Sequence, residues 1–413
     1  MQGNSVAISN NTLVNVQMVQ YSNDWVYVST QGIPAYPTGP FLDGNPSQAT
    51  ARNAIFKLPL SPVQNSGTPT NSTPGNIGLF INGVALFDYR DGVSWKNSTN
   101  SLAGGPSGGM GDNVWNRDAI VAERAGFDCA KGHPAMGNYH HHQNPSAFKL
   151  DLVVISNICN LYDADGLYVI DSAQHSPLIG FAYDGFPIYG AYAYKEVNGS
   201  GGIVRMKSGY QLRNISTRTT YANGSTVTPG PPVSSTYPLG YFREDYEFIT
   251  HLSDPDYLDA HNGRICVTPE YPAGTYAYFC TVDENWNSSY PYAVGPTFYG
   301  NKVAASVSSI TEPVTQYTPV TSSVPNTEFD NLKISVYPNP ATDLIAVQVN
   351  GLLKQDISVY LYELSGKLVA ESSINKGSTI AYFDTRKYYS GNYLLKVISG
   401  DNMLTQKVSI SRN

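Results

Sequence analysis

The sequence has few charged residues. Lys, Arg, Asp and Glu make up 14% of its 413 residues, against about 25% in a typical soluble protein. Long amphipathic helices need these residue types, so their scarcity argues against a helical protein. Gly, Pro, Ser, Thr, Asn and 31 Tyr take their place. Short strands joined by many turns are typical of this composition, and we expect an all-β fold.

Basic clusters and long apolar runs are also missing. The formal net charge is −7 and Lys and Arg are dispersed, which argues against nucleic acid as a partner. No run approaches the roughly 20 apolar residues of a membrane-spanning helix, so we expect no transmembrane segment. Residues 1–5 have neither a basic start nor an apolar segment. If the protein is exported, we expect that its signal peptide has been removed.

None of the four cysteines belongs to a Cys-x-x-Cys pair, which excludes a zinc ribbon or a thioredoxin-like site. In an oxidising compartment an even set permits two disulfides with three possible connectivities. Buried free thiols are the alternative. The candidates for disulfide formation are Cys129, Cys159, Cys266 and Cys280.

Turn clusters and one polar seam divide the chain. Residues 309–330 are rich in Thr, Ser and Pro and contain no Gly, which predicts an extended linker. Residues 1–308 predict one large antiparallel domain resembling a β-sandwich, with a short helix near 113–123. Residues 331–413 contain about seven strand-like runs separated by turns, the pattern of a small seven-stranded, immunoglobulin-like β-sandwich.

Two ten-residue segments of the large domain resemble each other. Gly78–Phe87 and Gly180–Tyr189 match in character at every position. Each has Asn-Gly or Asp-Gly between two apolar runs, a strong signal for a tight hairpin. The two hairpins are either pseudo-symmetric halves of one sheet system or a chance match.

The last domain closely resembles the C-terminal sorting domain of the type IX secretion system. The resemblance implies that this domain binds the secretion machinery at the outer membrane. It also implies that the protein is released outside the cell or held on the cell surface. Export in turn favours disulfides over free thiols. The stretches that carry the resemblance are Tyr337–Asp343, Ser365–Leu368, Ser390–Tyr393, Lys407 and Asn413.

Histidines are confined to the large domain, where all seven lie in the range His133–His261. If residues 139–142 are extended, successive side chains point to opposite faces. His140 and His142 then share one face, and Tyr139 and His141 share the other. Two imidazoles spaced in this way can bind one metal ion.

His133 lies before a short turn and can fold back as a third ligand. Neutral imidazole is a common ligand of copper and zinc, so the pattern predicts a copper or zinc site formed by His133, His140 and His142. Structural histidines held by hydrogen bonds are the alternative.

Two further residues are candidates. His175 precedes a Ser-Pro turn, and we expect it at a rim facing strand 139–142, as a fourth ligand. Asp184 occupies the Asp-Gly turn, where its default role is structural. With Tyr139 and His141 it is a candidate to support the metal or to bind a ligand.

An acidic loop lies further along the chain. It contains Asp254, Asp256 and Asp259 between His251 and His261. Such a loop can hold calcium or a second metal, although solvated loop residues are the simpler interpretation.

The large domain resembles the YHYH domain family, named for a Tyr-His-Tyr-His motif. Here the motif is Tyr139-His140-His141-His142, so its third position departs from the family while both alternate histidines remain. The family name implies no particular reaction. The resemblance spans most of residues 75–304 and rests on Gly78–Gly83, Gly132–Pro134, His175–Gly180, Asp184–Gly190, Leu258–Asp259, Asn262–Arg264 and Thr268–Tyr278.

Two functional hypotheses follow. The first is a secreted copper or zinc protein, in which the metal would act as a Lewis acid or redox centre if the protein is an enzyme. The second is a non-catalytic surface module that binds a glycan, another protein or a small molecule through exposed aromatic residues such as Trp286, Tyr290 and Tyr292. A hydrolase with paired acids is disfavoured because carboxylates are sparse and none pairs near the histidines.

Overall fold

The structure is a computed structural model that forms two units, Met1–Tyr317 and Thr318–Asn413. Strands dominate both units, and the single α-helix in the described part of the chain has 5 residues, so the all-β class is confirmed. No helix among the described residues is long and apolar enough to span a membrane. The structure describes residues 12–34, 36, 38–39, 41, 47–105, 108–145, 172–318, 333–350, 353, 355–364, 366–400 and 402–411.

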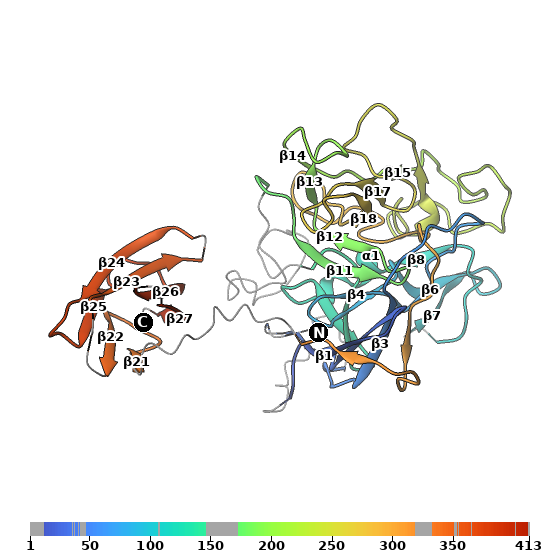
Figure 1. The fold of residues 1–413 in the computed structure, drawn as a ribbon. Helices are drawn as coiled ribbons and strands as arrows, with labels where there is room; N and C mark the ends of the chain where they lie inside the picture. The colour runs from blue at the N-terminus through green and yellow to red at the C-terminus, as the bar shows by residue number, and fades with distance from the viewer. Residues whose placement is uncertain are drawn as a thin grey trace. The chain divides into compact units, whose positions relative to one another are not determined.

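The first unit is built on an eight-stranded mixed sheet. Its strands are β4 (Asn76–Phe80), β5 (Ala85–Phe87), β9 (Gly132–Ala135), β10 (Asn138–His141), β11 (Leu178–Ala182), β12 (Pro187–Tyr189), β17 (Gly263–Cys266) and β18 (Thr275–Phe279). Across the sheet their order is β17-β18-β12-β11-β4-β5-β10-β9, and Figure 1 shows β11, β12 and β18 side by side.

The pattern of parallel and antiparallel pairs in this sheet is symmetric about its centre. At its centre β4 and β11 pair antiparallel, with Leu79 opposite Phe181. On either side follow an antiparallel pair, a parallel pair and another antiparallel pair. The two predicted hairpins, β4–β5 and β11–β12, are confirmed, and both have a bulge at the same position of the register. The two halves are therefore related by a local two-fold pseudosymmetry.

A second sheet covers one face of the first. It has the order β19-β3-β2-β1-β20. Side chains of both sheets form one buried cluster, with Val28 and Phe56 on one side and Leu79, Tyr139 and Tyr278 on the other. Each fully buried large apolar side chain contributes about 1.5–3 kcal/mol. The five strands are β1 (Val16–Tyr21), β2 (Trp25–Thr30), β3 (Ala54–Pro59), β19 (Ala305–Val307) and β20 (Thr315–Gln316).

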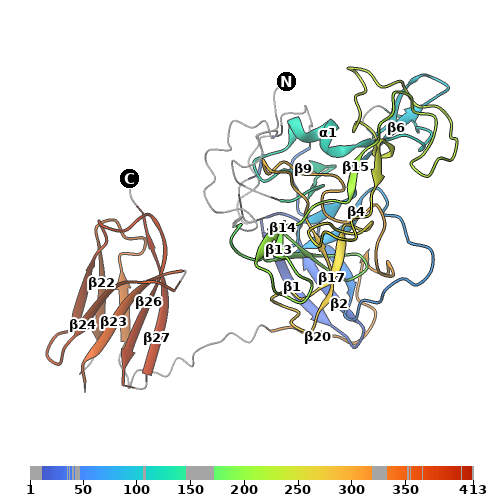
Figure 2. The ribbon, with the colours of Figure 1, turned by 90° about the horizontal axis from the view of Figure 1, so that it is seen from above.

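Smaller elements complete the first unit, and Figure 2 shows the helix α1 and strands β6 and β15 among them. Strands β6 (Arg90–Lys96), β7 (Ser101–Gly104) and β8 (Asn116–Asp118) form a three-stranded sheet. The helix α1 (Ala119–Glu123) and the 3-10 helix η2 (Arg124–Gly126) follow directly. The rest are two hairpins and a 3-10 helix: β13 (Tyr192–Tyr194) with β14 (Ile203–Arg205), β15 (Tyr210–Leu212) with β16 (Tyr246–Phe248), and η3 (Arg243–Asp245).

Two boundaries differ from the sequence predictions. The expected helix near 113–123 is reduced to α1, because residues Asn116–Asp118 pair with β6 as strand β8. The first residues of the predicted linker belong to the first unit, since Thr315 and Gln316 pair with β1. The remainder of that linker, residues 319–330, lies outside the described residues.

The second unit has seven strands in its described part, as predicted. They form a three-stranded sheet, β21-β22-β25, and a four-stranded sheet, β24-β23-β26-β27. In β23 the buried residues Ile357, Val359 and Leu361 alternate with less buried ones, as expected for a strand with one face on a core. The strands are β21 (Lys333–Tyr337), β22 (Leu344–Asn350), β23 (Ile357–Glu363), β24 (Leu368–Ile374), β25 (Ile380–Asp384), β26 (Gly391–Ser399) and β27 (Asn402–Ile410).

A buried ion pair holds the long connection between β15 and β16. The side chains of Arg218 and Asp245 are both fully buried and form two parallel bonds of 2.7 and 2.8 Å. Arg218 also donates to the carbonyls of Pro231, Tyr237 and Pro238. The connection, which has little regular structure, therefore depends on one guanidinium group.

We expect Arg218→Ala to lower the free energy of unfolding of the first unit by about 3–5 kcal/mol, because it leaves a buried carboxylate without a partner. Urea denaturation followed by tryptophan fluorescence measures this unit alone, since all four tryptophans lie in it. The matched control is Lys207→Ala, which removes partly exposed ion pairs and should lower stability by less than about 1 kcal/mol. Equal losses in the two variants would contradict the prediction.

Candidate metal centre

The candidate site is built on the hairpin β9–β10, which an aspartate turn positions. Asp128 Oδ1 accepts the N–H groups of Ala130 (3.0 Å) and Gly132 (3.1 Å). Its Oδ2 accepts the hydroxyl of Tyr139 at 2.8 Å. Gly132 is required because a Cβ there would lie 2.4 Å from that hydroxyl oxygen. These contacts bring β9 beside β10, with His133 opposite His140.

The other half of the sheet repeats this arrangement. Asp259 Oδ1 accepts the N–H groups of His261 (2.8 Å) and Gly263 (3.2 Å) and the hydroxyl of Tyr276 (3.0 Å). A Cβ at Gly263 would lie 2.3 Å from the Tyr276 hydroxyl oxygen. The strand register then makes Arg264 the counterpart of His133.

Side chains alternate along β10 as expected for a strand. Tyr139 belongs to the core between the two large sheets, and the Nε2 atom of His141 lies 2.9 Å from the hydroxyl of Tyr36. His140 and His142 occupy the opposite face, where His140 stacks on Phe87 with ring centroids 3.7 Å apart.

The structure brings three of the four predicted ligands together. His133, His140 and His142 are buried, and one ring nitrogen of each lies within 4.8 Å of the others. The Nε2 atoms of His140 and His142 are 3.0 Å apart. Four donors placed tetrahedrally around zinc lie about 3.3 Å from one another, so this spacing suits a shared ion.

Hydrogen bonds fix the tautomers of two of these rings. The Nδ1 atom of His140 lies 2.9 Å from the carbonyl oxygen of Asn138, and the Nδ1 atom of His142 lies 2.5 Å from that of Asp88. A carbonyl only accepts, so both Nδ1 atoms donate and both Nε2 atoms present lone pairs when the rings are neutral. Lone pairs that face each other at 3.0 Å repel, and a shared cation removes this repulsion.

Glu123, at the end of α1, lies beside two of the three histidines. Its Oε2 atom is 3.3 Å from Nε2 of His133 and 3.2 Å from Nε2 of His142. Burial raises the pKa of Glu123, but the neighbouring imidazoles of His133 and His142 outweigh burial and hold the pKa below its usual value. The group is therefore a carboxylate, a ligand type that zinc and copper accept beside imidazole.

His140 and His141 are poor bases in this setting. Burial, followed by the neighbouring His133 and His142, holds the pKa of His140 well below its usual value. Burial lowers the pKa of His141 to about 3. Neutral imidazole is the form that binds a metal, so the environment suits coordination.

The placement predicted for His175 is wrong. Its ring packs against Tyr189 on β12 and Phe279 on β18, with centroids 5.2 and 6.1 Å away, and its Nδ1 atom lies 2.7 Å from the carbonyl of Ser176. Strands β12 and β10 are four positions apart in the sheet, which is about 19 Å. His175 therefore lies in the other half of the sheet.

The candidates for supporting roles are structural in their observed contacts. Asp184 accepts the hydroxyl of Tyr278 at 2.5 Å and the N–H of Gly300 at 2.8 Å, so it anchors the β11–β12 turn to a following loop. Tyr139 donates its hydroxyl to Asp128, and the ring of His141 is in hydrogen-bond contact with the hydroxyl of Tyr36. None of the three belongs to the group of histidines that could share a metal ion.

The cysteine prediction fails for one pair. Cys266 and Cys280 are free and buried. Cys266 is opposite Thr275 in the register, five residues from Cys280 and so about 16 Å away along the strand, too far for a disulfide. Cys129 is disulfide-bonded, but Cys159 lies outside the described residues, so their pairing stays a prediction.

Two other sequence candidates also change. Tyr290 and Tyr292, expected as exposed platforms, are 4% and 3% exposed because they pack with Tyr89 in a core cluster. In the acidic loop, the ammonium group of Lys207 lies 3.4 Å from Asp256 and 3.8 Å from Asp254. A lysine thus supplies the positive charge there, and the calcium interpretation is not favoured.

Sequence reasoning missed Glu123. It lies ten residues before His133 and within the predicted helix, so no spacing rule linked it to the histidines. Asp118, at the N-terminus of α1, was the available signal. Its Oδ1 atom accepts the N–H groups of Ile120 and Val121, and Asp followed by an apolar run is a typical helix start.

The fold and the site together define a β-sheet protein with a buried histidine centre and a separate small β-sandwich unit. The family model described as YHYH protein matches residues 55–291, more than half of the chain. The chain therefore belongs to the YHYH protein family.

The second unit is a secretion system C-terminal sorting domain, whose family model matches residues 335–411. This domain directs type IX secretion to the cell surface or the extracellular space. No curated protein matches the chain. One solved structure with similarity is the crystal structure of dimeric latent PorU from Porphyromonas gingivalis, with 14% identity over 28% of this chain and 11% of that chain and a TM-score of 0.17.

The cap of the helix that carries Glu123 makes stability depend on pH. Burial raises the pKa of Asp118 to about 7, whereas an unfolded Asp has a pKa of about 3.9. The folded protein therefore binds the Asp118 proton more tightly than the unfolded chain does. The stability that this proton contributes is lost as pH rises from about 4 to 7.

We expect Asp118→Asn, which keeps the capping oxygen, to show a smaller loss of stability between pH 5 and pH 8 than the native protein. Urea denaturation by tryptophan fluorescence, in the presence of a chelator, measures the difference. The same pH dependence in both proteins would show that Asp118 does not titrate in this range.

Proposed function

We propose that the first unit of this secreted protein binds one copper or zinc ion through His133, His140 and His142, with Glu123 as the fourth donor. The observation that carries the proposal is the pair of Nε2 atoms 3.0 Å apart on His140 and His142, both of which present lone pairs. A bound cation turns this repulsive contact into coordination.

The spacing of Glu123 supports the proposal. Its carboxylate oxygen lies 3.2–3.3 Å from two of the imidazoles, about the edge length of a tetrahedron around zinc. Carbonyl groups that accept from the far nitrogens of His140 and His142 are the usual outer contacts of metal-bound histidine.

The internal repeat argues against a purely structural role for the histidines. In the second half the register places Arg264, Ala277 and Phe279 at the positions of His133, His140 and His142. The same strands, turn and Asp–Tyr bond form there without any of the three histidines. Because the scaffold does not need them, their presence in one half favours a function that only this half performs.

The donor set suits a closed site. Three imidazoles and a carboxylate complete a tetrahedral shell, which in zinc proteins is typical of ions that are held rather than used to activate water. Copper accepts the same ligands, and its redox chemistry would then be available in the extracellular space. We therefore propose that this is a metal-binding protein. Whether it has redox activity depends on which ion it binds.

We expect the full-length protein, purified and reconstituted with copper or zinc, to retain about one ion per chain by inductively coupled plasma mass spectrometry. The double variant His140→Ala/His142→Ala should retain none, because two of the four donors are removed. His175→Ala is the matched control, since His175 is a histidine of the same unit outside the cluster, and it should retain the ion. A native protein that retains no ion would refute the proposed function.

The role of Glu123 is tested separately. Glu123→Gln keeps the shape of the side chain and removes its charge, and we expect the affinity for the ion to fall by at least about tenfold. Competition with a chromophoric chelator measures the change. Glu196→Gln, at an exposed turn, should leave the affinity as it is, and an unchanged affinity in Glu123→Gln would place Glu123 outside the coordination shell.

A further inference from the structure

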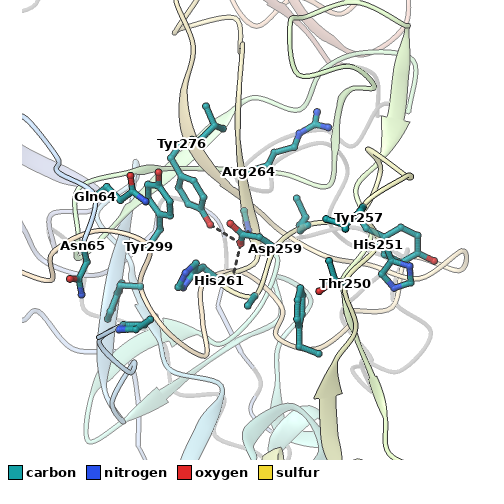
Figure 3. A pocket seen from close by; sticks show the side chains of 18 residues that line it. Gln64, Asn65, Thr250, His251, Tyr257, Asp259, His261, Arg264, Tyr276 and Tyr299 are labelled. Atoms are coloured by element: carbon teal, nitrogen blue, oxygen red, sulfur yellow. Dashed lines mark hydrogen bonds between the residues drawn. The ribbon is translucent and has the colours of Figure 1, made fainter. Parts of the chain in front are cut away.

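A second candidate site lies in the other half of the central sheet. A cavity of about 600 Å³ is lined by the edge strand β17, by the Asp259 turn and by loops that include Tyr257 and Tyr299 (Figure 3). This volume is within the range of sites that bind small molecules. The histidines of the metal cluster do not line it.

The repeat explains why an acceptor is available here. In the first half Asp128 Oδ2 accepts two donors of the protein itself, the N–H of Gly39 at 3.1 Å and the hydroxyl of Tyr139 at 2.8 Å. In the second half all three donors go to Oδ1 of Asp259, and no described residue bonds Oδ2. Oδ2 of Asp259 is therefore available to a ligand, whereas the equivalent oxygen of Asp128 is occupied by donors of the protein itself.

Flat aromatic surfaces border the cavity on two sides. The rings of Tyr276 and Tyr299 are parallel within 2° and 3.6 Å apart, and those of His251 and Tyr257 are within 15° and 3.7 Å apart. Figure 3 shows Asp259 between these two pairs. Tyr299 is only half-buried, so one of these rings is open to a ligand.

The polar groups of the cavity favour a neutral ligand. One acidic residue, Asp259, and one basic residue, Arg264, line the cavity, and the Arg264 guanidinium donates to the carbonyls of Lys195 and Pro255. The Nδ1 atom of His261 lies 2.7 Å from the hydroxyl of Thr297, which leaves Nε2 without a partner in the described part. A carboxylate oxygen and an imidazole nitrogen together match the hydroxyl groups of a polyol.

We propose that this cavity binds a neutral sugar ring. The apolar face of the ring packs on Tyr299, as aromatic side chains pack on other flat apolar surfaces. Its hydroxyl groups donate to Oδ2 of Asp259 and pair with His261. The site is independent of the metal centre, because it is built by the opposite half of the sheet.

The test is isothermal titration calorimetry of the full-length protein with glucose, galactose, mannose, N-acetylglucosamine, cellobiose and chitobiose. We expect at least one of these neutral sugars to bind at a single site, and Tyr299→Ala to weaken that binding at least about tenfold. Tyr317→Ala is the matched control, since Tyr317 is 52% exposed and lies outside the cavity, and it should bind as the native protein does. Choline and acetate are the ionic comparators.

Three outcomes would overturn the inference: no heat with any of the six sugars, unchanged binding in Tyr299→Ala, or tighter binding of choline or acetate. Asp259→Asn is a second variant. If tryptophan fluorescence shows that it is folded, it too should bind the sugar more weakly. If it does not fold, Tyr299→Ala decides alone, because Tyr299 is half-buried and its truncation is tolerated more easily. The His140→Ala/His142→Ala variant should bind the sugar normally, which separates this result from the metal proposal.

Discussion

The bond between a turn aspartate and a strand tyrosine, made twice, is the constraint on which the rest of the first unit depends. Asp128 with Tyr139 and Asp259 with Tyr276 each fold an outer hairpin onto the central sheet. A carboxylate that is wholly or partly removed from water is unfavourable unless several donors surround it, and here backbone N–H groups supply donors to both aspartates. The geometry of both outer hairpins follows from satisfying that carboxylate.

On this repeated frame the two halves differ in opposite ways. The first half fills the space beside its aspartate with its own chain and places three histidines on the outer face of β10. The second half leaves the space beside its aspartate open and places Arg264, Ala277 and Phe279 where the histidines would be. The shared Asp–Tyr bonds stabilise both halves, and the candidate binding sites lie where the two halves differ.

Much of this could be read from the sequence, for identifiable reasons. The Asn-Gly and Asp-Gly turns, the period-two alternation of residues 139–142 and the strand runs of the sorting domain are local signals, and they predicted hairpins, a shared face for His140 and His142, and a small sandwich. Glu123 and the true position of His175 depend on strand order, which no local signal encodes. The free thiols of Cys266 and Cys280 depend on register in the same way.

The central pairing of β4 with β11 has a consequence for how such a fold can arise. Leu79 faces Phe181 across a seam at which each half offers an equivalent strand in an equivalent register. A chain that encoded only the first half would expose β4 as an open edge, and a second copy could pair with it in the same antiparallel way. Such a half-length chain would form a symmetric dimer with one histidine cluster in each subunit, whereas in the described part of this protein only the first half carries the cluster.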